Sequence, residues 1–344
     1  MSRKVRVGII GCGAIAERLH VPDYAVCAEA ELVAFCDIKR DKAEALADRF
    51  APGAKVFTDY KDLLRDGDCE AVSVCLPNNL HGPVSIHAAQ TGHHVLVEKP
   101  MATSSAEAQK MIDAAKAAGV QLLVDQCQRR YAPYRKAKEV LESGVLGKIL
   151  YVSAMFGHSG PEVWSPTGKW FFDKKQARFG AMADLGVHKA DMIRYLTGKE
   201  IAEIAAFYTR LEKPKATVED NFAACIKFDD GTLGTLGASW TFKGLGADYF
   251  YAHCANGSLR INVHPDKAVW AHLHKPEGEI LFELPAPLNE YHEGWGVDIG
   301  GGFVRAILGL EKPFCTGEEG KKALEIILAA EKAADTGKTV KLKH

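Results

Sequence analysis

A short strand that runs into a glycine-rich loop near the start most constrains how this 344-residue chain can fold. Residues 5–10 are mostly apolar and β-branched and stop at a glycine, which is typical of a buried parallel strand. Gly11 permits a tight turn, Gly13 lets the backbone approach a pyrophosphate, and Ala16 lets a following helix lie close to the sheet. That helix would present unpaired N–H groups to phosphates. The pattern predicts a dinucleotide-binding turn, although a glycine turn without a ligand has the same letters.

An acidic residue follows the next expected strand. Residues 31–36 form a second apolar run that ends in Asp37, about twenty residues beyond the glycine loop, where a carboxylate binds the adenosine ribose hydroxyls in this type of fold. Because the carboxylate would repel a 2′-phosphate, we expect NAD to be preferred over NADP. Lys39 and Arg40 lie close enough in sequence to soften that preference, so NADP stays an alternative.

Strands and helices then alternate as far as about residue 125. Strands are expected at residues 71–76, 94–97 and 121–124, and helices at 43–50, 84–91 and 105–118. This alternation predicts a doubly wound parallel sheet whose ligands bind at the carboxyl ends of the strands. We therefore assign residues 1–125 to a Rossmann domain that binds NAD or NADP.

The pattern changes beyond that point. Asp230-Gly231 and Asn256-Gly257 each separate two apolar runs, which is a strong signal for a β-hairpin. We expect residues 126–344 to form an α/β domain for substrate binding and oligomerisation, with a large, mostly antiparallel sheet covered by helices on one face. The second face would need a partner, so we expect a homodimer or homotetramer. Candidates for that face are Trp240, Phe250 and Tyr251.

Charge and cysteine content argue against several classes of protein. The formal net charge is −1 and there is no basic block, so nucleic acid is not an expected partner. The nine cysteines include no Cys-x-x-Cys pair, which indicates reduced thiols in the cytoplasm rather than a disulfide framework or a zinc site. No segment is apolar enough for a transmembrane helix, so we expect no membrane partner. The absence of a zinc-type cysteine pattern also leads us to expect no metal ion.

Three residues that lie far apart in the sequence have the chemistry for proton transfer. Lys99 ends an expected buried strand, where Pro100 holds it extended; a solvated surface lysine is the plainer alternative. Asp184 and His188 stand at i and i+4, so both project from one face of the helix expected over about residues 180–196. A capping aspartate with a buried histidine would have the same spacing, and so would a metal pair, but no third ligand is suitably spaced.

Taken in order, these motifs resemble the Gfo/Idh/MocA family over nearly the whole chain. The matching elements are the glycine loop, Asp37, Pro77-Asn78-x-x-His81, Glu98-Lys99-Pro100 and Asp184-x-x-x-His188. The resemblance implies an NAD-linked oxidoreductase that acts on a secondary alcohol of a sugar, polyol or cyclitol. It also implies a cofactor site formed by Gly11, Gly13, Ala14, Ile15, Asp37, Leu76, Pro77, Asn78, His81, Glu98 and Lys99.

The resemblance further implies how three residues divide the chemistry, each in contact with the substrate. His188 would accept the hydroxyl proton, since the unperturbed pKa of histidine suits reversible proton transfer near neutral pH. Lys99 would hydrogen-bond the same oxygen and stabilise the developing alkoxide. Asp184 would orient His188 or a neighbouring substrate hydroxyl.

The substrate class is the least specified part. His158, Trp164 and Trp170 lie in long loops and would either contact a sugar ring or pack within those loops. Residues 178–181 read Arg-Phe-Gly-Ala where many relatives carry a glycine run, which puts the loop shape in question. Two other functions remain open: a hydrolase of the same fold that oxidises a glycoside transiently, and a nucleotide-binding regulatory protein without chemistry. The intact catalytic residues argue against the second.

Overall fold

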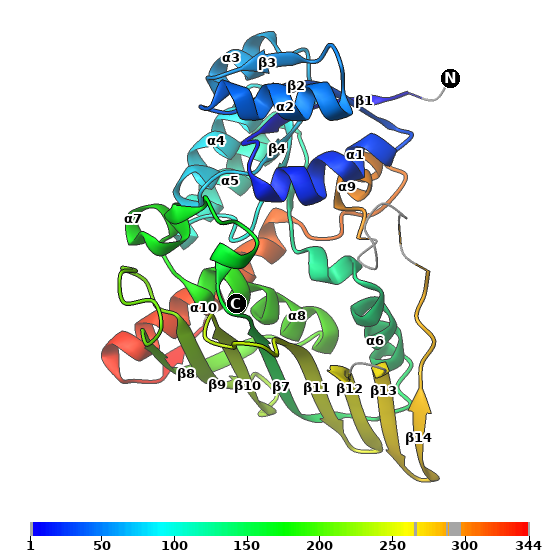
Figure 1. Cartoon of the computed structure of the whole chain (residues 1–344). Helices are drawn as coiled ribbons and strands as arrows, with labels where there is room; N and C mark the ends of the chain where they lie inside the picture. Colours follow the sequence, from blue (N-terminus) through cyan, green and yellow to red (C-terminus); the bar gives the residue numbers. More distant parts are fainter. Residues whose placement is uncertain (1–2, 265–266, 287, 289–296, 343–344) are drawn as a thin grey trace. The chain divides into compact units, whose positions relative to one another are not determined.

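The chain forms two compact units, described by a computed structural model that covers residues 3–264, 267–286, 288 and 297–342. The first unit comprises residues 1–130 and 287–321, and the second comprises residues 131–286 and 322–344. Figure 1 shows the elements along the chain, coloured from the blue N-terminus to the red C-terminus.

The first unit is built on a six-stranded parallel sheet with the order β3-β2-β1-β4-β5-β6. The strands are β1 (Val5–Ile10), β2 (Ala30–Cys36), β3 (Lys55–Phe57), β4 (Ala71–Val74), β5 (His94–Val97) and β6 (Leu122–Val124). The strand order reverses between β1 and β4, which confirms the doubly wound sheet. The central strands are buried on both faces, because the consecutive residues Val7 to Ile10 of β1 and all four residues of β4 are buried.

Helices connect these strands. They are α1 (Val21–Val26), α2 (Arg40–Phe50), α3 (Tyr60–Asp66), α4 (Asn78–Gln90) and α5 (Ser105–Ala118), with a π-helical turn over Ala16–His20 and a 3-10 turn over Cys127–Arg130. Helix α4 begins directly after Pro77, six residues before the expected start at Val84, and it contains Pro83. The predicted start was therefore wrong: the helix continues through Pro83, which gives up one backbone hydrogen bond.

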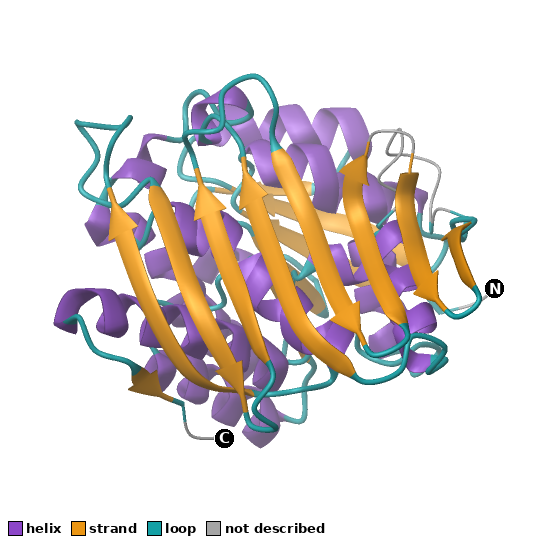
Figure 2. Cartoon of the chain, turned by 90° about the horizontal axis from the view of Figure 1, so that it is seen from below, coloured by secondary structure: helices purple, strands orange, loops and turns teal. Residues whose placement is uncertain are grey.

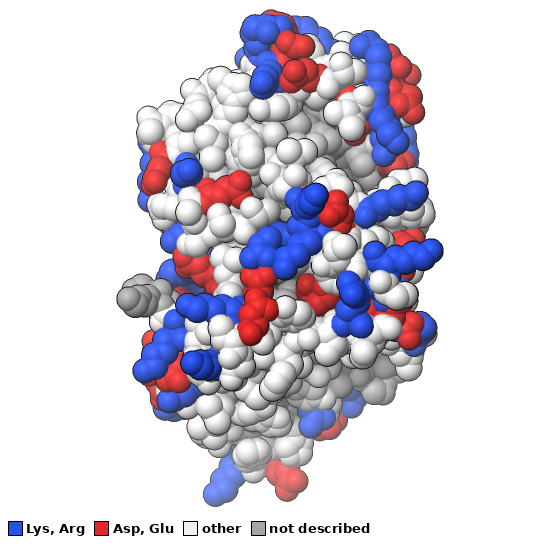
Figure 3. All heavy atoms as spheres, turned by 90° about the vertical axis from the view of Figure 1, so that its left-hand side faces the viewer, with Lys and Arg blue, Asp and Glu red and all other residues white. Residues whose placement is uncertain are grey.

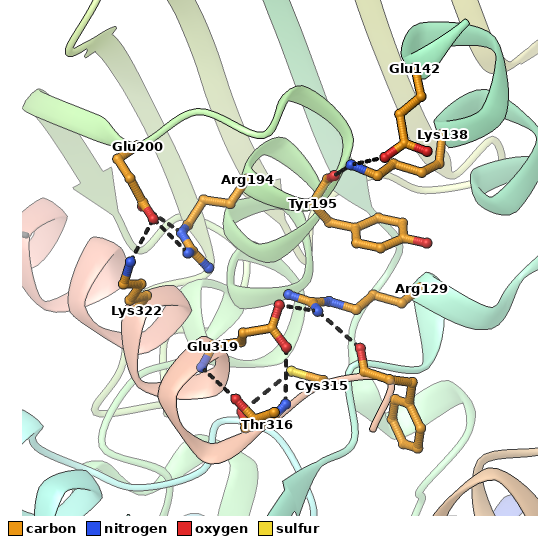
Figure 4. Close-up of polar contacts among 11 residues, drawn as sticks. Arg129, Lys138, Glu142, Arg194, Tyr195, Glu200, Cys315, Thr316, Glu319 and Lys322 are labelled. Atoms are coloured by element: carbon orange, nitrogen blue, oxygen red, sulfur yellow. Dashed lines mark hydrogen bonds and ion pairs between the residues drawn. The ribbon is translucent and has the colours of Figure 1, made fainter. Parts of the chain in front are cut away.

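Residues 287–321 belong to the first unit, whereas the sequence analysis placed them in the second domain. Helix α9 (Ile299–Ile307) is held by Asp23, whose carboxylate accepts hydrogen bonds from the N–H groups of Ile299 at 2.6 Å and Gly300 at 3.3 Å. Arg129 donates to Glu319 at 2.6 Å, as Figure 4 shows. These pairs are separated by about two hundred residues or more, so no local sequence pattern announces them.

The second unit contains a nine-stranded sheet with the order β14-β13-β12-β11-β7-β10-β9-β8-β15. Its strands are β7 (Ile149–Gly157), β8 (Ile201–Thr209), β9 (Asn221–Phe228), β10 (Leu233–Ser239), β11 (Ala247–Cys254), β12 (Gly257–His264), β13 (Lys267–His274), β14 (Glu277–Leu281) and β15 (Val340–Lys341). All neighbours are antiparallel except β7 and β10. The two predicted hairpins, β9–β10 and β11–β12, are confirmed.

Helices pack against one face of this sheet. They are α6 (Ala132–Glu142), α8 (Val187–Thr197) and α10 (Gly317–Thr336), with a π-helical turn at Met182–Gly186. The unit also contains α7 (Lys174–Ala177) and short 3-10 turns at Pro161–Val163 and Lys169–Phe172. Figure 2 shows the opposite face of the sheet in front, with no helix over it. On α8, Arg194 donates to Glu200 through both Nε and a terminal nitrogen, and Lys322 of α10 donates to the same carboxylate (Figure 4).

The expected residues of the uncovered face need correction. Trp240 and Phe250 are 1% and 0% exposed and lie in the core under the helices. Tyr251 follows Phe250 along a strand, so its side chain points to the uncovered face. There it stacks on His253, with ring centroids 6.2 Å apart. Phe207, 78% exposed, lies on β8 of the same sheet.

The surface carries both signs of charge. On the face presented in Figure 3, lysine and arginine side chains are interspersed with aspartate and glutamate. Within the described ranges, no helix combines the length and the apolar character needed to cross a membrane. All nine cysteines lie in described parts of the chain and are free thiols.

Candidate active site

The glycine loop of the first unit fits the close approach of a phosphate group. Gly11 has a φ of +94°, and a Cβ atom there would lie 2.3 Å from the carbonyl oxygen of Cys75. Only glycine is compatible with both conditions. A Cβ at Gly13 would meet no atom of the described chain within 4 Å, so the space beside that residue is open. The fully buried Ala16 then brings the next helical turn against the sheet.

Asp37 is fixed at the end of β2 beside this loop. One carboxylate oxygen accepts the Cys12 N–H at 2.9 Å, and the other accepts the Lys39 N–H at 2.8 Å. The carboxylate therefore joins the glycine loop to the start of α2. Arg40, which was expected to weaken discrimination against a 2′-phosphate, donates to Glu44 at 2.7 Å on the exposed side of that helix. An exposed pair of this kind holds the guanidinium only weakly.

His81 connects two strand ends. It is 1% exposed, and its two ring nitrogens lie 2.7 Å from the carbonyl oxygens of Leu76 and Pro100. Two carbonyl acceptors favour the imidazolium, but burial is the larger effect and lowers the pKa of His81. The ring thus joins the segment after β4, which includes Pro77 and Asn78, to the residue that follows Lys99. Its expected part in cofactor binding stays a prediction.

Lys99 lies immediately beyond β5 and is half-buried rather than a solvated surface lysine. The preceding Glu98 is 6% exposed, and its N–H donates to the Val74 carbonyl at 3.1 Å, which continues the β4–β5 ladder. The Glu98 carboxylate accepts the Lys99 N–H at 3.1 Å. The backbone that leads into the lysine is therefore fixed at the end of the sheet.

In the second unit, Asp184 and His188 lie on continuous helical structure. Asp184 is in the π-helical turn Met182–Gly186, and His188 is in the first turn of α8. They are 6% and 5% exposed. The π-helical turn was not predicted; such turns are rare and are frequent at functional sites.

Asp184 has two aromatic neighbours that carry N–H groups. The Trp240 indole donates to its Oδ2 at 2.9 Å, and Nε2 of His158 lies 3.7 Å from the same oxygen. Because Nδ1 of His158 accepts the Gly160 N–H at 2.9 Å, the neutral ring carries its proton on Nε2, toward Asp184. Trp240 was missed in the sequence analysis as a site residue, because nothing local relates it to Asp184.

The ring of Phe156 lies beside two histidines, His188 and His158. The Phe156 centroid lies 6.0 Å from the ring of His188 and 6.0 Å from the ring of His158. The structure therefore brings together the three polar residues that the sequence analysis selected in this unit, namely Asp184, His188 and His158.

Glu219 fixes the start of the helical segment that carries Asp184. Its Oε1 accepts hydrogen bonds from the N–H groups of Gly180 at 2.8 Å and Met182 at 2.9 Å. Burial raises the pKa of Glu219 to about 7, although the two backbone donors oppose the increase. A Cβ at Gly180 would lie 1.9 Å from the Glu219 carbonyl oxygen, so glycine is required there. Glu219 was also missed in the sequence analysis, since it precedes β9 and is distant from the helix in sequence.

Residues 178–181, which depart from the family pattern, are held by contacts of Arg178. Arg178 adopts a φ of +71° at the end of α7. Its guanidinium donates to both carboxylate oxygens of Glu331 on α10, at 2.5 and 2.6 Å, and lies 4.4 Å from the centroid of Phe179. A bidentate pair of this geometry is directional and holds the loop in one conformation.

A fully buried lysine follows His188 in α8. Lys189 is 0% exposed and contacts the hydroxyl of Tyr134 and the carboxylate of Asp248. Burial lowers the pKa of Lys189, and Asp248 opposes that change. Because Asp248 lies on β11, this contact ties the helix of His188 to the sheet.

The two loop tryptophans pack around one phenylalanine. Trp170 stacks on Phe171 with centroids 3.8 Å apart, and Trp164 meets the same ring edge-on at 5.3 Å. These contacts explain how the loop is ordered. Contact of either indole with a sugar stays a prediction.

Comparison with known proteins supports the resemblance at the level of both domains. The model of the oxidoreductase family with an NAD-binding Rossmann fold matches residues 5–126, and that of the GFO/IDH/MocA C-terminal domain matches residues 134–260. The chain is 30% identical to 1,5-anhydro-D-fructose reductase from Ensifer adhaerens, over 98% of this chain and 98% of that protein. It is 27% identical to myo-inositol 2-dehydrogenase from Thermotoga maritima, over 99% of both chains.

Solved structures agree with this relation. Aldose-aldose oxidoreductase from Caulobacter crescentus, complexed with glycerol, superposes with a TM-score of 0.85 at 26% identity and covers 99% of this chain and 100% of its own. Levoglucosan dehydrogenase in complex with NADH and levoglucosan has a TM-score of 0.85 at 25% identity, with the same coverage. The chain therefore belongs to the Gfo/Idh/MocA family of oxidoreductases and carries the NAD-binding Rossmann domain of that family.

Proposed function

We propose that the protein is a dehydrogenase that transfers hydride between NAD and a secondary alcohol carbon of a sugar, polyol or cyclitol. Family membership supports the reaction class, and relatives named for anhydrofructose, inositol and levoglucosan support the substrate class. The observation that carries the proposal is the buried pair of Asp184 and His188. Asp184 is fixed by the Trp240 indole, and His188 follows it on the same helical segment.

Each catalytic residue has a defined task in this proposal. His188 takes the hydroxyl proton in the oxidative direction and returns it in the reductive one. Lys99 donates a hydrogen bond to the same oxygen and stabilises the alkoxide charge that develops there. Asp184 keeps its carboxylate beside the helix of His188 and orients the imidazole or an adjacent substrate hydroxyl. Bound nicotinamide supplies the hydride chemistry, while these side chains supply position and charge.

The residues of the first unit fit the cofactor. Gly11 permits the tight turn, Gly13 leaves the backbone beside it accessible, and we expect the first N–H groups after the loop, at Ala14 and Ile15, to face a pyrophosphate. Asp37 would hold the ribose diol and disfavour a 2′-phosphate, which supports NAD as the preferred cofactor.

A substrate screen tests the proposed function. The purified protein is incubated with NAD and a panel of sugars, polyols and cyclitols, and the formation of NADH is followed by the absorbance of the reduced nicotinamide. Net NADH formation with a member of the panel is the expected result. Glycoside cleavage without net NADH would instead indicate transient oxidation, and no turnover with NAD or NADP in either direction would contradict the proposal.

A second copy of the chain is the partner that we propose for the uncovered sheet face. Arg260 lies over the rings of Tyr251 and Trp270, 5.4 and 4.4 Å from their centroids, so this face presents planar groups suited to a protein interface. Light scattering at micromolar protein concentration is expected to show a dimer or tetramer. A stable monomer would contradict the proposal.

A further inference from the structure

A buried histidine in the first unit contacts two carboxylates at once. Nε2 of His20 lies 3.0 Å from Oε1 of Glu98 and 3.3 Å from Oδ2 of Asp125. Its Nδ1 lies 3.2 Å from the Ser73 hydroxyl, which is 2.7 Å from the hydroxyl of Tyr24. The exposed fractions of His20, Glu98 and Asp125 are 0%, 6% and 1%. His20 closes the π-helical turn after the glycine loop, whereas the carboxylates follow β5 and β6, so the group joins three separate elements.

This arrangement of one histidine and two carboxylates requires a proton between them. Two ionised carboxylates without a cation would be very costly to bury, and an imidazolium that donates to both reduces that cost. Burial by itself lowers the pKa of His20, but contacts with Cys75, Asp125 and Glu98 outweigh it and raise that pKa well above its usual range. The same contact with His20 outweighs burial for Glu98 and lowers its pKa to about 2.

The third member of the cluster, Asp125, and the neighbouring groups Cys75, Tyr24 and Lys99 also affect its charge. Burial, followed by the Glu98 charge, raises the pKa of Asp125 to about 7. Burial also keeps Cys75 and Tyr24 neutral by raising the pKa of each, and Lys99 helps to lower the pKa of Glu98. Near neutral pH the group therefore holds a charged His20, a charged Glu98 and a partly protonated Asp125.

Glu98 connects this cluster to the catalytic lysine. Its Oε1 faces His20, while its Oε2 accepts the Lys99 N–H at 3.1 Å. We propose that His20 is a positioning residue for Lys99: it holds the Glu98 carboxylate, which in turn holds the backbone of the lysine. The inference deepens the proposed function and rests on it, because the role of Lys99 is itself part of that proposal.

A divalent cation is the alternative occupant of this group. The ligand atoms of His20, Glu98 and Asp125 all lie within 4.8 Å of one another, which a metal ion would accept. The separations of 3.0 and 3.3 Å from the imidazole nitrogen are hydrogen-bond distances, and a shared proton explains them without an ion. We therefore favour the proton, and metal content becomes an outcome of the test.

Kinetics of His20 variants test the inference. His20→Leu removes both contacts, whereas His20→Gln keeps an uncharged amide NH2 group that can donate to the carboxylates. We expect His20→Leu to lower kcat by about tenfold or more, because a small displacement of a catalytic group is costly, and to change the affinity for NAD by less than about threefold. His20→Gln should recover most of the loss. His93, which is 7% exposed and contacts Thr91 rather than this cluster, gives the matched controls His93→Leu and His93→Gln.

A second measurement does not depend on activity. In protein labelled with ¹⁵N, the ring nitrogens of His20 should report a doubly protonated imidazole near neutral pH, and His20→Gln should shift the Lys99 backbone amide more than His93→Gln does. A neutral His20, an unmoved Lys99 amide, or a fall in kcat no larger than that of His93→Leu would overturn the inference. So would one divalent ion per chain, measured by mass spectrometry, that is lost in His20→Leu. These outcomes are separate from the proposed function: normal kcat in Lys99→Ala would remove the catalytic lysine even where the amide shift is observed.

Discussion

The two units hold the groups that we propose as catalytic by different means. Lys99 follows β5 of a parallel sheet, and the groups around it come from the ends of neighbouring strands. Asp184 and His188 lie on a helix whose anchors, Trp240 and Glu219, come from loops beside an antiparallel sheet. In a parallel sheet, the carboxyl ends meet by topology, so short motifs there identify a site. Where side chains distant in sequence supply the anchors, the motif points to candidate catalytic residues but not to the residues that hold them.

The largest expected effect comes from the second unit. His188→Ala should lower kcat by about a hundredfold or more, since it removes the proposed general base, while the affinity for NAD stays near normal. Steady-state kinetics with the identified substrate and a fluorescence titration with NADH separate the two effects. His274→Ala, at an exposed position of β13, is the control. Near-normal kcat in His188→Ala would mean that this half of the site is structural.

Glu219 gives the second unit a distinct dependence of stability on pH. Its pKa is raised to about 7, so the stability that it contributes is complete below its ordinary pKa near 4.5 and is lost as the pH rises through about 7. Glu219→Gln removes this dependence. Between pH 4.5 and 8, the wild type should lose about 3 kcal/mol of unfolding free energy relative to the variant, because the pKa moves by roughly two and a half units.

Urea unfolding at several pH values measures that difference. Glu277→Gln, at an exposed residue of β14, should track the wild type at every pH. If the unfolding free energy of Glu219→Gln also changes with pH as that of the wild type does, Glu219 is already ionised at low pH. The start of the helix is then held by a permanent charge.

Loss of the hydrogen bond from the Trp240 indole to Asp184 should have an intermediate effect. Trp240→Phe keeps the ring packing but removes the N–H that the buried carboxylate accepts, so stability should fall by about 1–3 kcal/mol and kcat by roughly tenfold. Trp270→Phe is the matched control, because its indole N–H has no hydrogen-bond partner among the described residues. Equal effects of the two substitutions would show that the Trp240 contact does not support catalysis.

The smallest expected effect concerns the cofactor site of the first unit. The wild type should have a kcat/KM for NAD about tenfold or more above that for NADP, since the Asp37 carboxylate repels a 2′-phosphate. Asp37→Ser should narrow this ratio, and Glu44→Gln, which releases Arg40, should narrow it slightly. Kinetics with both cofactors decide the matter. A higher kcat/KM with NADP in the wild type would contradict the assignment.

The sequence predicted the parallel sheet of the first unit but not β3 or α3. The glycine loop, the doubly wound sheet and the position of Asp37 follow from short patterns whose physical basis is local. The start of α4 was predicted at Val84, whereas the helix begins at Asn78 and contains Pro83. The inclusion of residues 287–321 could not be read from sequence, because it depends on the contact of Asp23 with α9.

In the second unit, alternating apolar residues and two hairpin turns were enough to predict an antiparallel sheet with helices on one face. These patterns did not assign each side chain to the correct face of the sheet: Trp240 and Phe250 belong to the core, while Tyr251 faces outward. The choice of face changes with every residue along a strand, so an error of one position reverses it. Glu219 and His20 were not selected at all, since each becomes significant only through partners that folding brings near.

A double-mutant cycle at Lys99 and His188 is the most direct test of the central claim, which is that residues from both units act on one substrate oxygen. We expect each single alanine variant to lower kcat by about a hundredfold, and the double variant to lie within about threefold of the poorer single one, because groups that act as a unit lose their joint contribution once. Loss in the double variant equal to the product of the single losses, on the order of ten-thousandfold, would contradict the claim and show that the two residues act independently.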